Sequence, residues 1–319
     1  MTQEISIVDS IAFTFGLGET ELSVFLRTAP YRYKIYYIKK RSGTGYREIA
    51  QPAKGLKTMQ RFVIKEFCED SFPIHDAAMA YTKGVSIRDN ALAHSGSNYI
   101  LKMDFENFFH SLVDTDLQKH TERHCSNMPS DFEFVFANLF FRKNKVSKRR
   151  FVSMGAPSSP FLSNSLMYEF DVEVSELAKK HDVVYTRYAD DLTFSSIAPD
   201  VLFGFPAEIQ KILARIEYPV VKINEAKTVF ASKKNNRHVT GLVITNEGSV
   251  SIGRKKKRYV KSLCFSFINS KLGDDGVEKL NGLLAYINDV EPTFLDALSL
   301  KYGEDIIAKV KSAQAKLYR

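Results

Sequence analysis

Two adjacent aspartates, Asp190 and Asp191, stand between two β-rich runs and limit the local fold more than any other feature of this chain. Residues 183–189 and 192–196 are rich in β-branched and aromatic side chains, so the simplest arrangement is a tight hairpin with both carboxylates at its tip. Such close carboxylates repel each other unless a cation or solvent screens them. Asp104 ends a third β-rich run and is expected beside the tip. Three converging carboxylates favour a Mg²⁺ site.

Two Mg²⁺ ions bound side by side would give these carboxylates a role in phosphoryl transfer. A pair of ions about 4 Å apart activates an attacking hydroxyl group and stabilises the leaving group. Nucleotide polymerisation needs this help, because phosphoryl transfer depends mainly on positioning and charge neutralisation. Two adjacent aspartates taken alone are more often a solvated turn. The motifs elsewhere in the chain therefore decide between the two interpretations.

Helical and strand patterns mix without regular alternation, which predicts an α+β fold. Helices are expected in 4–29 with a break at Gly16–Gly18, in 55–70, from Pro160 to Leu177, in 205–216, and from Lys255 onward. Strands are expected in 33–39 and 46–49, joined by a turn at 42–45, and in 99–105, 183–189, 192–196, 227–231, 239–244 and 250–252.

The composition indicates the kind of partner. Of the 319 residues, 45 are Lys or Arg and 37 are Asp or Glu, which gives a net charge of +8. A basic surplus favours a polyanionic partner such as nucleic acid or an anionic membrane surface. No run of about 18 apolar residues is present, so no membrane-spanning segment is expected. Three scattered cysteines form no disulfide or zinc pattern, and the N-terminus lacks signal-peptide features, so we expect a cytoplasmic protein.

Tyr188–Asp191 (Tyr-Ala-Asp-Asp) resembles the Tyr-x-Asp-Asp hairpin of reverse transcriptases, and Lys102–Phe109 resembles the first palm motif of that family. The resemblance implies that Asp104 and the backbone carbonyl of Phe105 bind the two Mg²⁺ ions together with the hairpin aspartates. It also implies that Phe109 is an aromatic gate. Its ring would clash with a ribose 2′-hydroxyl and so favour deoxynucleoside triphosphates. The alternative for Phe109 is core packing.

Gly155–Pro160 resembles the family's loop-and-helix motif, which shapes the nucleotide pocket and supports the template. The resemblance implies that Gly155, Ala156 and Pro157 bind the nucleotide. Many relatives carry Gln before this glycine, where the present chain has Met154. The departure leaves open any polar contact made by that side chain, but it does not affect the metal site.

Two basic residues are expected to contact the triphosphate. Lys222–Thr228 resembles the fourth palm motif, which implies that Lys227 approaches the triphosphate or the leaving group. The alternative for Lys227 is a solvated lysine. Arg47 matches the fingers arginine that grips the incoming triphosphate, and a bidentate guanidinium suits phosphate oxygens. The alternative for Arg47 is an ordinary surface arginine.

Two short stretches narrow the resemblance to retron reverse transcriptases. Asn90–His94 (Asn-Ala-Leu-Ala-His) resembles the Asn-Ala-x-x-His element of retron enzymes, and Val239–Gly241 resembles their Val-Thr-Gly element. The resemblance covers roughly residues 30–260. The residues expected to bind RNA through these elements are Asn90, His94, Thr240 and Gly241.

The family implies a right-hand polymerase with three parts. N-terminal helices and fingers are expected in 1–98, the palm in 99–245 with a fingers insertion around 115–155, and a helical thumb in 246–319. The segment beyond the palm is too short for an additional RNase H domain. Removal of copied RNA is therefore expected from a host RNase H.

Five consecutive basic residues open the predicted thumb: Arg254, Lys255, Lys256, Lys257 and Arg258. Such runs often bind a phosphate backbone in a salt-dependent way. A second basic cluster lies in 142–150. A solvated loop is the alternative for each cluster, but in a polymerase we expect both to contact RNA or duplex.

The retron resemblance also implies a substrate and a biological role. A structured noncoding RNA would serve as template and primer, and synthesis would start from a guanosine 2′-hydroxyl to give a branched RNA–DNA product (msDNA). The role would be defence against phage together with an effector protein. One alternative is another bacterial reverse transcriptase, of group II intron or diversity-generating type. The other is a non-catalytic RNA-binding scaffold that restrains a toxin. A palm-type nucleotide cyclase is disfavoured by the fingers hairpin and by Gly155–Pro160.

Overall fold

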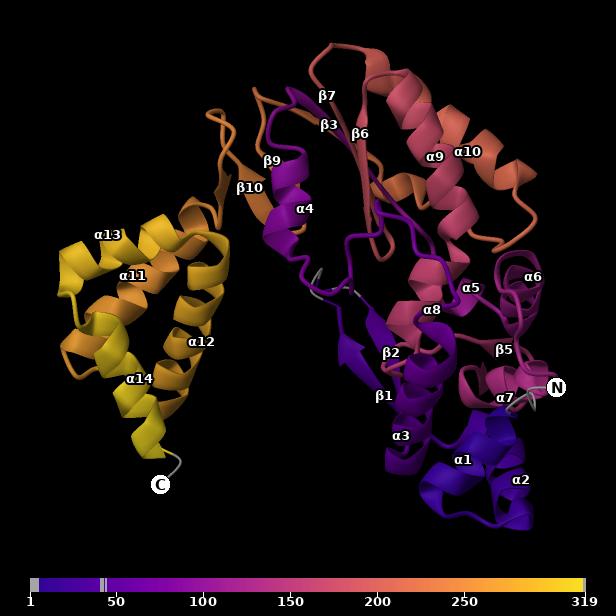
Figure 1. The fold of residues 1–319 in the computed structure, drawn as a ribbon. Coiled ribbons are helices and arrows are strands. Elements are labelled where there is room, and N and C mark those ends of the chain that lie inside the picture. Colours follow the sequence, from indigo (N-terminus) through magenta and orange to yellow (C-terminus); the bar gives the residue numbers. More distant parts are fainter. Residues whose placement is uncertain (1–5, 41–42, 44, 318–319) are drawn as a thin grey trace. The chain divides into compact units, whose positions relative to one another are not determined.

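The computed structural model describes residues 6–40, 43 and 45–317, with side chains to residue 314, and the chain forms two compact units. Unit 1 consists of Met1–Lys83, Lys102–Leu192 and Phe203–Val229. Unit 2 consists of Gly84–Leu101, Thr193–Leu202 and Phe230–Arg319. Each unit is thus assembled from segments that are far apart in the sequence (Figure 1).

Unit 1 begins with two short helices, α1 (Ile7–Phe15) and α2 (Glu19–Thr28). Gly16 ends α1 in the left-handed conformation (φ 62°), where a residue without Cβ is not penalised. The predicted break at the glycines is confirmed.

A two-stranded hairpin follows, built from β1 (Tyr33–Lys39) and β2 (Tyr46–Pro52), which pair antiparallel from Tyr33 opposite Pro52 to Lys39 opposite Tyr46. This confirms the predicted hairpin, although Ser42 and Thr44 of its turn lie outside the described residues. The predicted helix at 55–70 is α3 (Lys54–Val63), and it continues as a π-helix over Ile64–Cys68.

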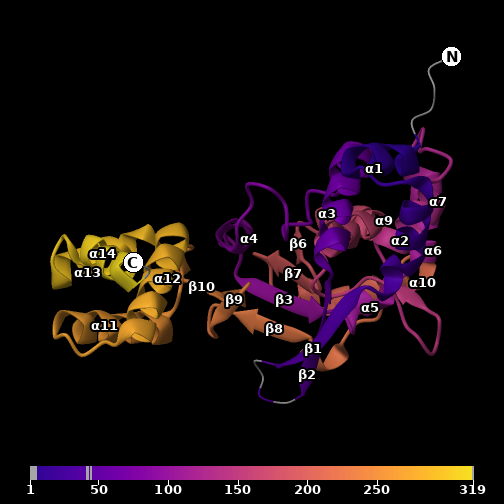
Figure 2. The same cartoon turned by 90° about the horizontal axis from the view of Figure 1, so that it is seen from below.

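The central sheet has the strand order β6-β7-β3-β8, which can be followed in Figure 2. Its strands are β3 (Tyr99–Asp104), β6 (Val184–Tyr188), β7 (Asp191–Ser196) and β8 (Val229–Ser232). Three helices of unit 1 lie between these strands in the sequence. Helices α8 (Ser159–Leu166) and α9 (Tyr168–Lys180) precede β6, and α10 (Phe205–Arg215) lies between β7 and β8. Helix α9 packs against β6 and α10. The continuous helix predicted after Pro160 is instead broken at Met167.

The segment that contains the insertion predicted around 115–155 has its own small elements in unit 1. These are α5 (Phe108–Ser111), α6 (Asp114–His124), α7 (Phe132–Leu139), β4 (Arg142–Lys143) and β5 (Arg150–Phe151). Aromatic side chains form much of the local core, as in the Phe136–Phe140 pair, whose ring centroids are 5.0 Å apart. The assignment of the predicted insertion to the fingers remains a prediction.

Unit 2 combines helix α4 (Ile87–Ala93) with a three-stranded sheet and a group of helices (Figure 1). The strands are β9 (Arg237–Val239), β10 (Leu242–Ile244) and β11 (Val250–Ser251). The helices are α11 (Arg254–Ile268), α12 (Asp274–Val290), α13 (Pro292–Tyr302) and α14 (Ile306–Leu317). One hydrophobic core joins them, with Ala91, Val239, Val260 and Leu284 among its members.

Sequence periodicity missed one turn in unit 2. The single strand expected at 239–244 is a hairpin, because Thr240 (φ 47°) and Gly241 (φ 78°) reverse the chain between β9 and β10. Two consecutive residues with positive φ are typical of the tightest hairpin turns. The helical segment expected from Lys255 onward is confirmed as α11 to α14. No helix in the described part of the chain is long and apolar enough to cross a membrane.

Candidate active site

The end of β3 and the β6–β7 turn hold the three aspartates predicted from the sequence, all within unit 1. Asp104 is the last residue of β3 and Asp191 is the first residue of β7, with Asp190 in the turn before it. Ala189 adopts a positive φ of 57°, which closes the turn. The backbone N–H of Phe105 donates to the carbonyl of Asp190 at 3.1 Å, so β3 and the turn are joined beside the carboxylates.

The three aspartates bring an excess of negative charge into a partly buried site. Burial raises the pKa of Asp190, and the nearby Asp104 carboxylate raises it further. Burial, followed by the Asp190 carboxylate, raises the pKa of Asp191 to about 6. The ammonium group of Lys227 donates to both carboxylate oxygens of Asp104, at 2.7 and 2.9 Å. These carboxylates therefore favour a bound cation.

The carboxylate oxygens of the three aspartates are suitable ligands for Mg²⁺, although these side chains are not arranged as a complete coordination site. Across the described residues, no group of three or more His, Cys, Asp or Glu has the arrangement of a metal site. The three aspartates nevertheless supply hard carboxylate oxygens, which Mg²⁺ prefers. Asp104, only 6% exposed, already binds a cationic group. The side chain of Phe105 carries no oxygen atom, so the predicted ligand role can fall only to its backbone carbonyl.

A buried ion pair between Arg187 and Asp171 supports the turn between β6 and β7. The guanidinium of Arg187 on β6 binds the Asp171 carboxylate of α9, with Nη2 2.6 Å from Oδ2, and both side chains are completely buried. Arg187 also donates from Nη1 to the carbonyl of Ala189 at 3.2 Å. The phenol of Tyr185 donates to the same Asp171 at 2.7 Å. This network holds the backbone immediately before Asp190.

A pocket of about 450 Å³ adjoins Asp190 and gathers most of the predicted nucleotide-binding residues. Its lining includes Arg47 from β2, Phe109 from α5, and the loop residues Gly155, Ala156 and Pro157. Lys227 is placed differently, since its ammonium group pairs with Asp104. Three residues that sequence reasoning missed also line the pocket: Lys57, Arg61 and Tyr81.

The two neighbouring phenylalanines of α5 have different surroundings. Phe108 is 3% exposed, and its ring stacks on Phe105 with centroids 5.5 Å apart. Phe109 is only partly buried and lines the pocket. Core packing is therefore the role of Phe108, and the position of Phe109 fits the predicted gate.

The loop before α8 packs directly on the β1–β2 hairpin. The N–H of Ala50 on β2 donates to the carbonyl of Met154 at 2.8 Å. Gly155 has a φ of 112°, and a Cβ atom there would lie 3.1 Å from Cγ2 of Ile49 and 3.3 Å from the carbonyl oxygen of Ala50. Glycine is favoured because a side chain would be strained at this positive φ and would press on β2. The observed strand contact uses the backbone of Met154, so it does not depend on which side chain occupies that position.

The residues missed by sequence analysis had weak local signals. Lys57 and Arg61 stand four residues apart, which places them on one face of the predicted helix. Asp171 interrupts an otherwise apolar helical face, and Arg187 lies within a β-rich run. A buried charge usually needs a partner, but nothing local identifies that partner.

Asn90 and His94 correct an expectation. Both were predicted to bind RNA, yet both side chains are completely buried in unit 2. The Nδ1 atom of His94 lies 2.8 Å from Oγ of Ser195, and burial lowers the pKa of His94 to about 3, so the imidazole is neutral at pH 7. A direct RNA contact by either side chain is contradicted by this burial, because helix α4 turns that face into the core.

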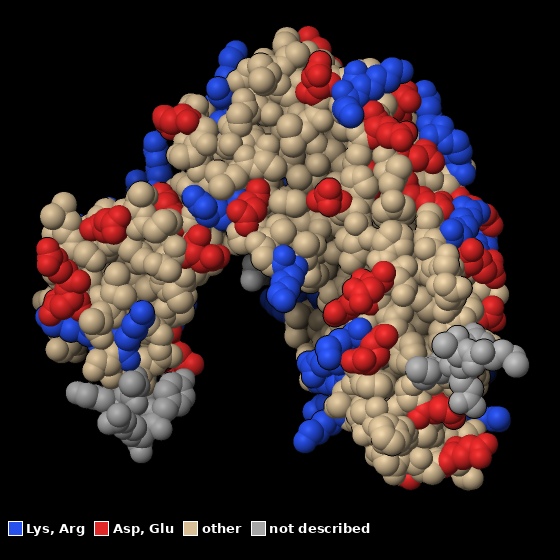
Figure 3. All heavy atoms as spheres, in the orientation of Figure 1, with Lys and Arg blue, Asp and Glu red and all other residues tan. Residues whose placement is uncertain are grey.

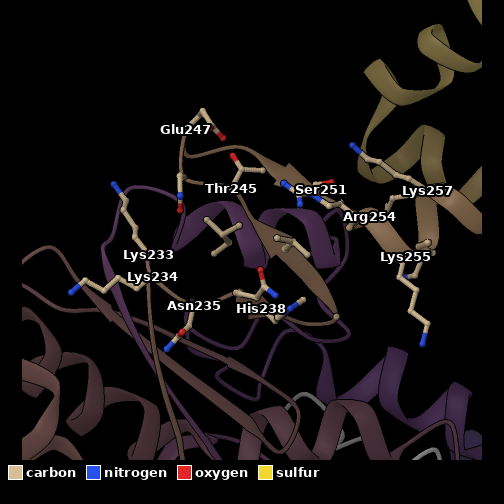
Figure 4. Close-up of a pocket in the computed structure, with 18 of the residues that line it drawn as sticks. Lys233, Lys234, Asn235, His238, Thr245, Glu247, Ser251, Arg254, Lys255 and Lys257 are labelled. Atoms are coloured by element: carbon tan, nitrogen blue, oxygen red, sulfur yellow. Dashed lines mark hydrogen bonds between the residues drawn. The ribbon is translucent and has the colours of Figure 1, made fainter.

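A second pocket of about 980 Å³ lies in unit 2, and we call it the basic hollow. Five of the predicted RNA-binding residues line it: Gly241, Arg254, Lys255, Lys256 and Lys257. The lining does not include Thr240 or Arg258. Among the described residues that line it are six basic side chains and one acidic side chain, Glu247. Figure 4 shows Lys233 and Lys234 on one side of the hollow and Arg254, Lys255 and Lys257 on the other.

The five basic residues at the start of α11 divide into two groups. Arg254, Lys255 and Arg258 are exposed. Lys257 forms an ion pair with Glu291, and Lys256 donates to the phenol oxygen of Tyr286 at 3.2 Å. The predicted run is therefore only partly directed to solvent.

Of the two residues in the β9–β10 turn, Gly241 lines the basic hollow and Thr240 does not. The Thr240 hydroxyl donates to the carbonyl of Ile87 at 3.1 Å, which links the β9–β10 turn to α4. Gly241 is exposed and lines the hollow. Thr240 thus holds the turn in place, while Gly241 is open to a ligand.

The second basic cluster is also partly used internally. Arg142 pairs with Glu48, and Arg150 pairs with Asp114 at 3.4 Å. Lys145, Lys148 and Arg149 are exposed. On the face drawn in Figure 3, acidic and basic residues are interspersed, so the basic surplus is best described by local clusters.

Comparison with known proteins identifies the family. Residues 38–244 match the family described as reverse transcriptase (RNA-dependent DNA polymerase). The chain is 41% identical over 307 residues to Retron Ec83 reverse transcriptase from Escherichia coli, covering 94% of this chain and 97% of that protein. The chain belongs to the retron reverse transcriptase family. It is an RNA-directed DNA polymerase with the right-hand polymerase fold.

Other relatives agree with this assignment. Retron Ec86 reverse transcriptase from Escherichia coli is 31% identical over 91% of this chain and 89% of that protein. Among solved structures, a foamy viral protease-reverse transcriptase in complex with RNA/DNA hybrid is similar with a TM-score of 0.44 and 13% identity, over 88% of this chain and 33% of that chain. The sequence match, rather than this structural likeness, carries the assignment to the retron family.

Proposed function

We propose that this retron reverse transcriptase copies part of a structured noncoding RNA into single-stranded DNA, starting from a 2′-hydroxyl of a guanosine in that RNA, so that the product is branched RNA–DNA (msDNA). The observation that supports this most directly is the aspartate cluster beside a basic pocket, in a chain 41% identical to Retron Ec83 reverse transcriptase.

In this proposal two Mg²⁺ ions are held by Asp104, Asp190, Asp191 and the carbonyl of Phe105. When bound, the ions supply activation of the attacking hydroxyl and neutralise charge on the transferring phosphoryl group. Lys227 already neutralises Asp104 in the structure, and we assign to it a second role near the leaving pyrophosphate.

The pocket residues would bind and orient the deoxynucleotide. Arg47, Lys57 and Arg61 place three positive charges around the same space, which suits a triphosphate. Phe109 would exclude a ribose 2′-hydroxyl. Gly155, Ala156 and Pro157 would form the wall against which the nucleotide rests, because that loop is hydrogen-bonded to β2.

The basic hollow would bind the RNA backbone. The first turn of α11 carries basic residues and no acidic one. Cations there are unfavourable beside the positive end of a helix dipole, and a bound phosphate would relieve this repulsion. We assign this contact to three exposed residues that line the hollow, Gly241, Arg254 and Lys255. Arg258, which is exposed on the same helix, would extend the contact beyond the hollow.

The wider role proposed is cytoplasmic defence against phage. An effector protein would be restrained by the enzyme with its DNA, and host RNase H would remove the copied RNA. These partners are proposed from membership of the retron family alone.

The test is purification of the chain from cells that also express its flanking noncoding DNA. The copurified nucleic acid is digested with nucleases and analysed on gels. We expect a short single-stranded DNA that stays joined to RNA until a debranching enzyme releases it. Asp190→Asn should abolish the DNA, with RNA binding retained, because a metal ligand is removed.

Asp182→Asn is the matched control. It removes the same charge from an exposed position before β6, and Asn tolerates the positive φ of 52° found there. Its DNA yield should equal that of the wild type. RNA without DNA from the wild type would contradict the msDNA proposal, and phage protection by Asp190→Asn would favour a scaffold role.

A further inference from the structure

Tyr81 is a large aromatic residue whose position in the nucleotide pocket is unexplained by core packing. It lines the pocket together with Arg47 and Asp190, and it is 53% exposed. Partial burial raises the pKa of the Tyr81 phenol, and the Asp190 carboxylate raises it further. An exposed aromatic side chain beside charged groups, within a site of concave shape, has an apolar face available to a ligand.

The backbone at Tyr81 is in the left-handed region, with a φ of 64°. A bulky residue rarely adopts this conformation, and it persists only where the surrounding structure imposes it. The preceding residues are fixed on β6. Ala78 forms a parallel bridge with Arg187, the N–H of Met79 donates to the carbonyl of Arg187 at 2.9 Å, and the N–H of Arg187 donates to the carbonyl of Ala77 at 2.7 Å.

Side chains fix the same segment on both sides of Tyr81. Asn164 donates from Nδ2 to the carbonyl of Ala80 at 2.7 Å, and the Thr82 hydroxyl donates to the carbonyl of Ala78, also at 2.7 Å. Arg187 donates to Oδ1 of Asn164 at 3.3 Å. Arg187 therefore positions both the segment that carries Tyr81 and the turn that carries Asp190.

We propose that the ring of Tyr81 is a stacking platform for a nucleobase at the polymerisation site. The inference rests on the proposed placement of the nucleotide between Arg47 and Asp190. The base belongs either to the incoming deoxynucleotide or to the templating residue, since both offer an aromatic face. Aromatic stacking suits a polymerase because it tolerates every base.

The test uses single-nucleotide primer extension on an RNA template with the full chain and Mg²⁺. Tyr81→Gly removes the ring and accepts a φ of 64° without strain, so the backbone is retained. Tyr81→Phe is the matched control, because it keeps the ring and removes only the hydroxyl. We expect Tyr81→Gly to lower kcat/KM for deoxynucleotides roughly tenfold to hundredfold, and Tyr81→Phe to stay within about twofold.

A template with an abasic residue at the templating position distinguishes the two bases. If the Tyr81→Gly defect disappears on that template, the ring stacks on the templating base. A defect of the same size on both templates assigns the ring to the incoming base. Wild-type kinetics in Tyr81→Gly, or an equal defect in Tyr81→Phe, would overturn this inference alone. Absence of extension by the wild type would overturn the proposed function as well.

Discussion

Arg187 and Asp171 are completely buried, and their side chains are joined by three hydrogen bonds of 2.6 to 3.1 Å. Burying a charged pair costs solvation free energy, so such a pair is weak evidence for net stabilisation. Its role here is positional, because the same guanidinium binds the carbonyl of Ala189 next to Asp190. A single residue thus connects the core of unit 1 to the turn that carries Asp190.

Replacing one partner of this pair should be severe. Asp171→Leu leaves Arg187 charged and unpaired, and we expect the free energy of unfolding, measured with urea, to fall by about 3–5 kcal/mol. The double variant Asp171→Leu, Arg187→Met should regain most of that stability, because apolar groups replace both charges. Its DNA synthesis should remain low, since Ala189 loses its donor. A cost below about 1 kcal/mol for Asp171→Leu would contradict this account.

At the scale of elements, the loop before α8 and strand β2 depend on each other. The carbonyl of Met154 accepts from the N–H of Ala50, and a Cβ atom on Gly155 would lie only 3.1 Å from Cγ2 of Ile49. Arg47 is on the same strand. Moving this loop would therefore change the wall of the pocket beside Asp190 relative to the arginine proposed to bind the triphosphate.

Gly155→Ala tests this dependence. The added Cβ would be strained at this positive φ and would press on β2. We therefore expect kcat/KM for deoxynucleotides to fall roughly tenfold to hundredfold, as it does when binding groups are slightly misplaced. Gly16→Ala is the control. It also places alanine at a positive φ, but nothing lies within 4 Å of the added atom, and it is in the N-terminal helices. Equal kinetics in the two variants would argue against the role given to this loop.

At the scale of the whole molecule, the net charge of +8 is consistent with a nucleic acid partner. The basic hollow is the feature of unit 2 in which basic side chains gather. Its exposed basic residues are Lys233 and Lys234, together with Arg254 and Lys255 at the start of helix α11. Lys257 is not equivalent to its neighbours, because it is paired with Glu291. The charge that is available to RNA is therefore smaller than the run of five residues indicates.

Salt dependence measures that available charge. The double variant Arg254→Gln, Lys255→Gln should bind an RNA hairpin more weakly, and the slope of log K against log salt concentration should shrink by about 2, because each phosphate that is no longer neutralised lowers the slope by roughly 1. Lys271→Gln, an exposed lysine after α11, should leave the slope unchanged. An unchanged slope in the double variant would remove the basic hollow from the proposed RNA site.

The sequence by itself determined the features that depend on neighbouring residues. Alternating β-rich runs predicted the hairpin around Asp190 and Asp191, which the structure confirms as β6 and β7. Glycines predicted the break between α1 and α2. The order of short motifs indicated the retron family, which the comparisons show. Such features can be predicted from the sequence because periodicity and turn chemistry are local properties of a chain.

Only the tertiary structure decided which side chains meet. It buried Asn90 and His94, paired Lys257 with Glu291, and brought Tyr81 into the pocket beside Asp190. These outcomes depend on packing between distant segments, where the cost of burying a polar group is weighed against the partners that happen to lie nearby. The amino-acid sequence shows that a charged group or an amide is present, but the fold decides whether that group faces water, a ligand or another side chain.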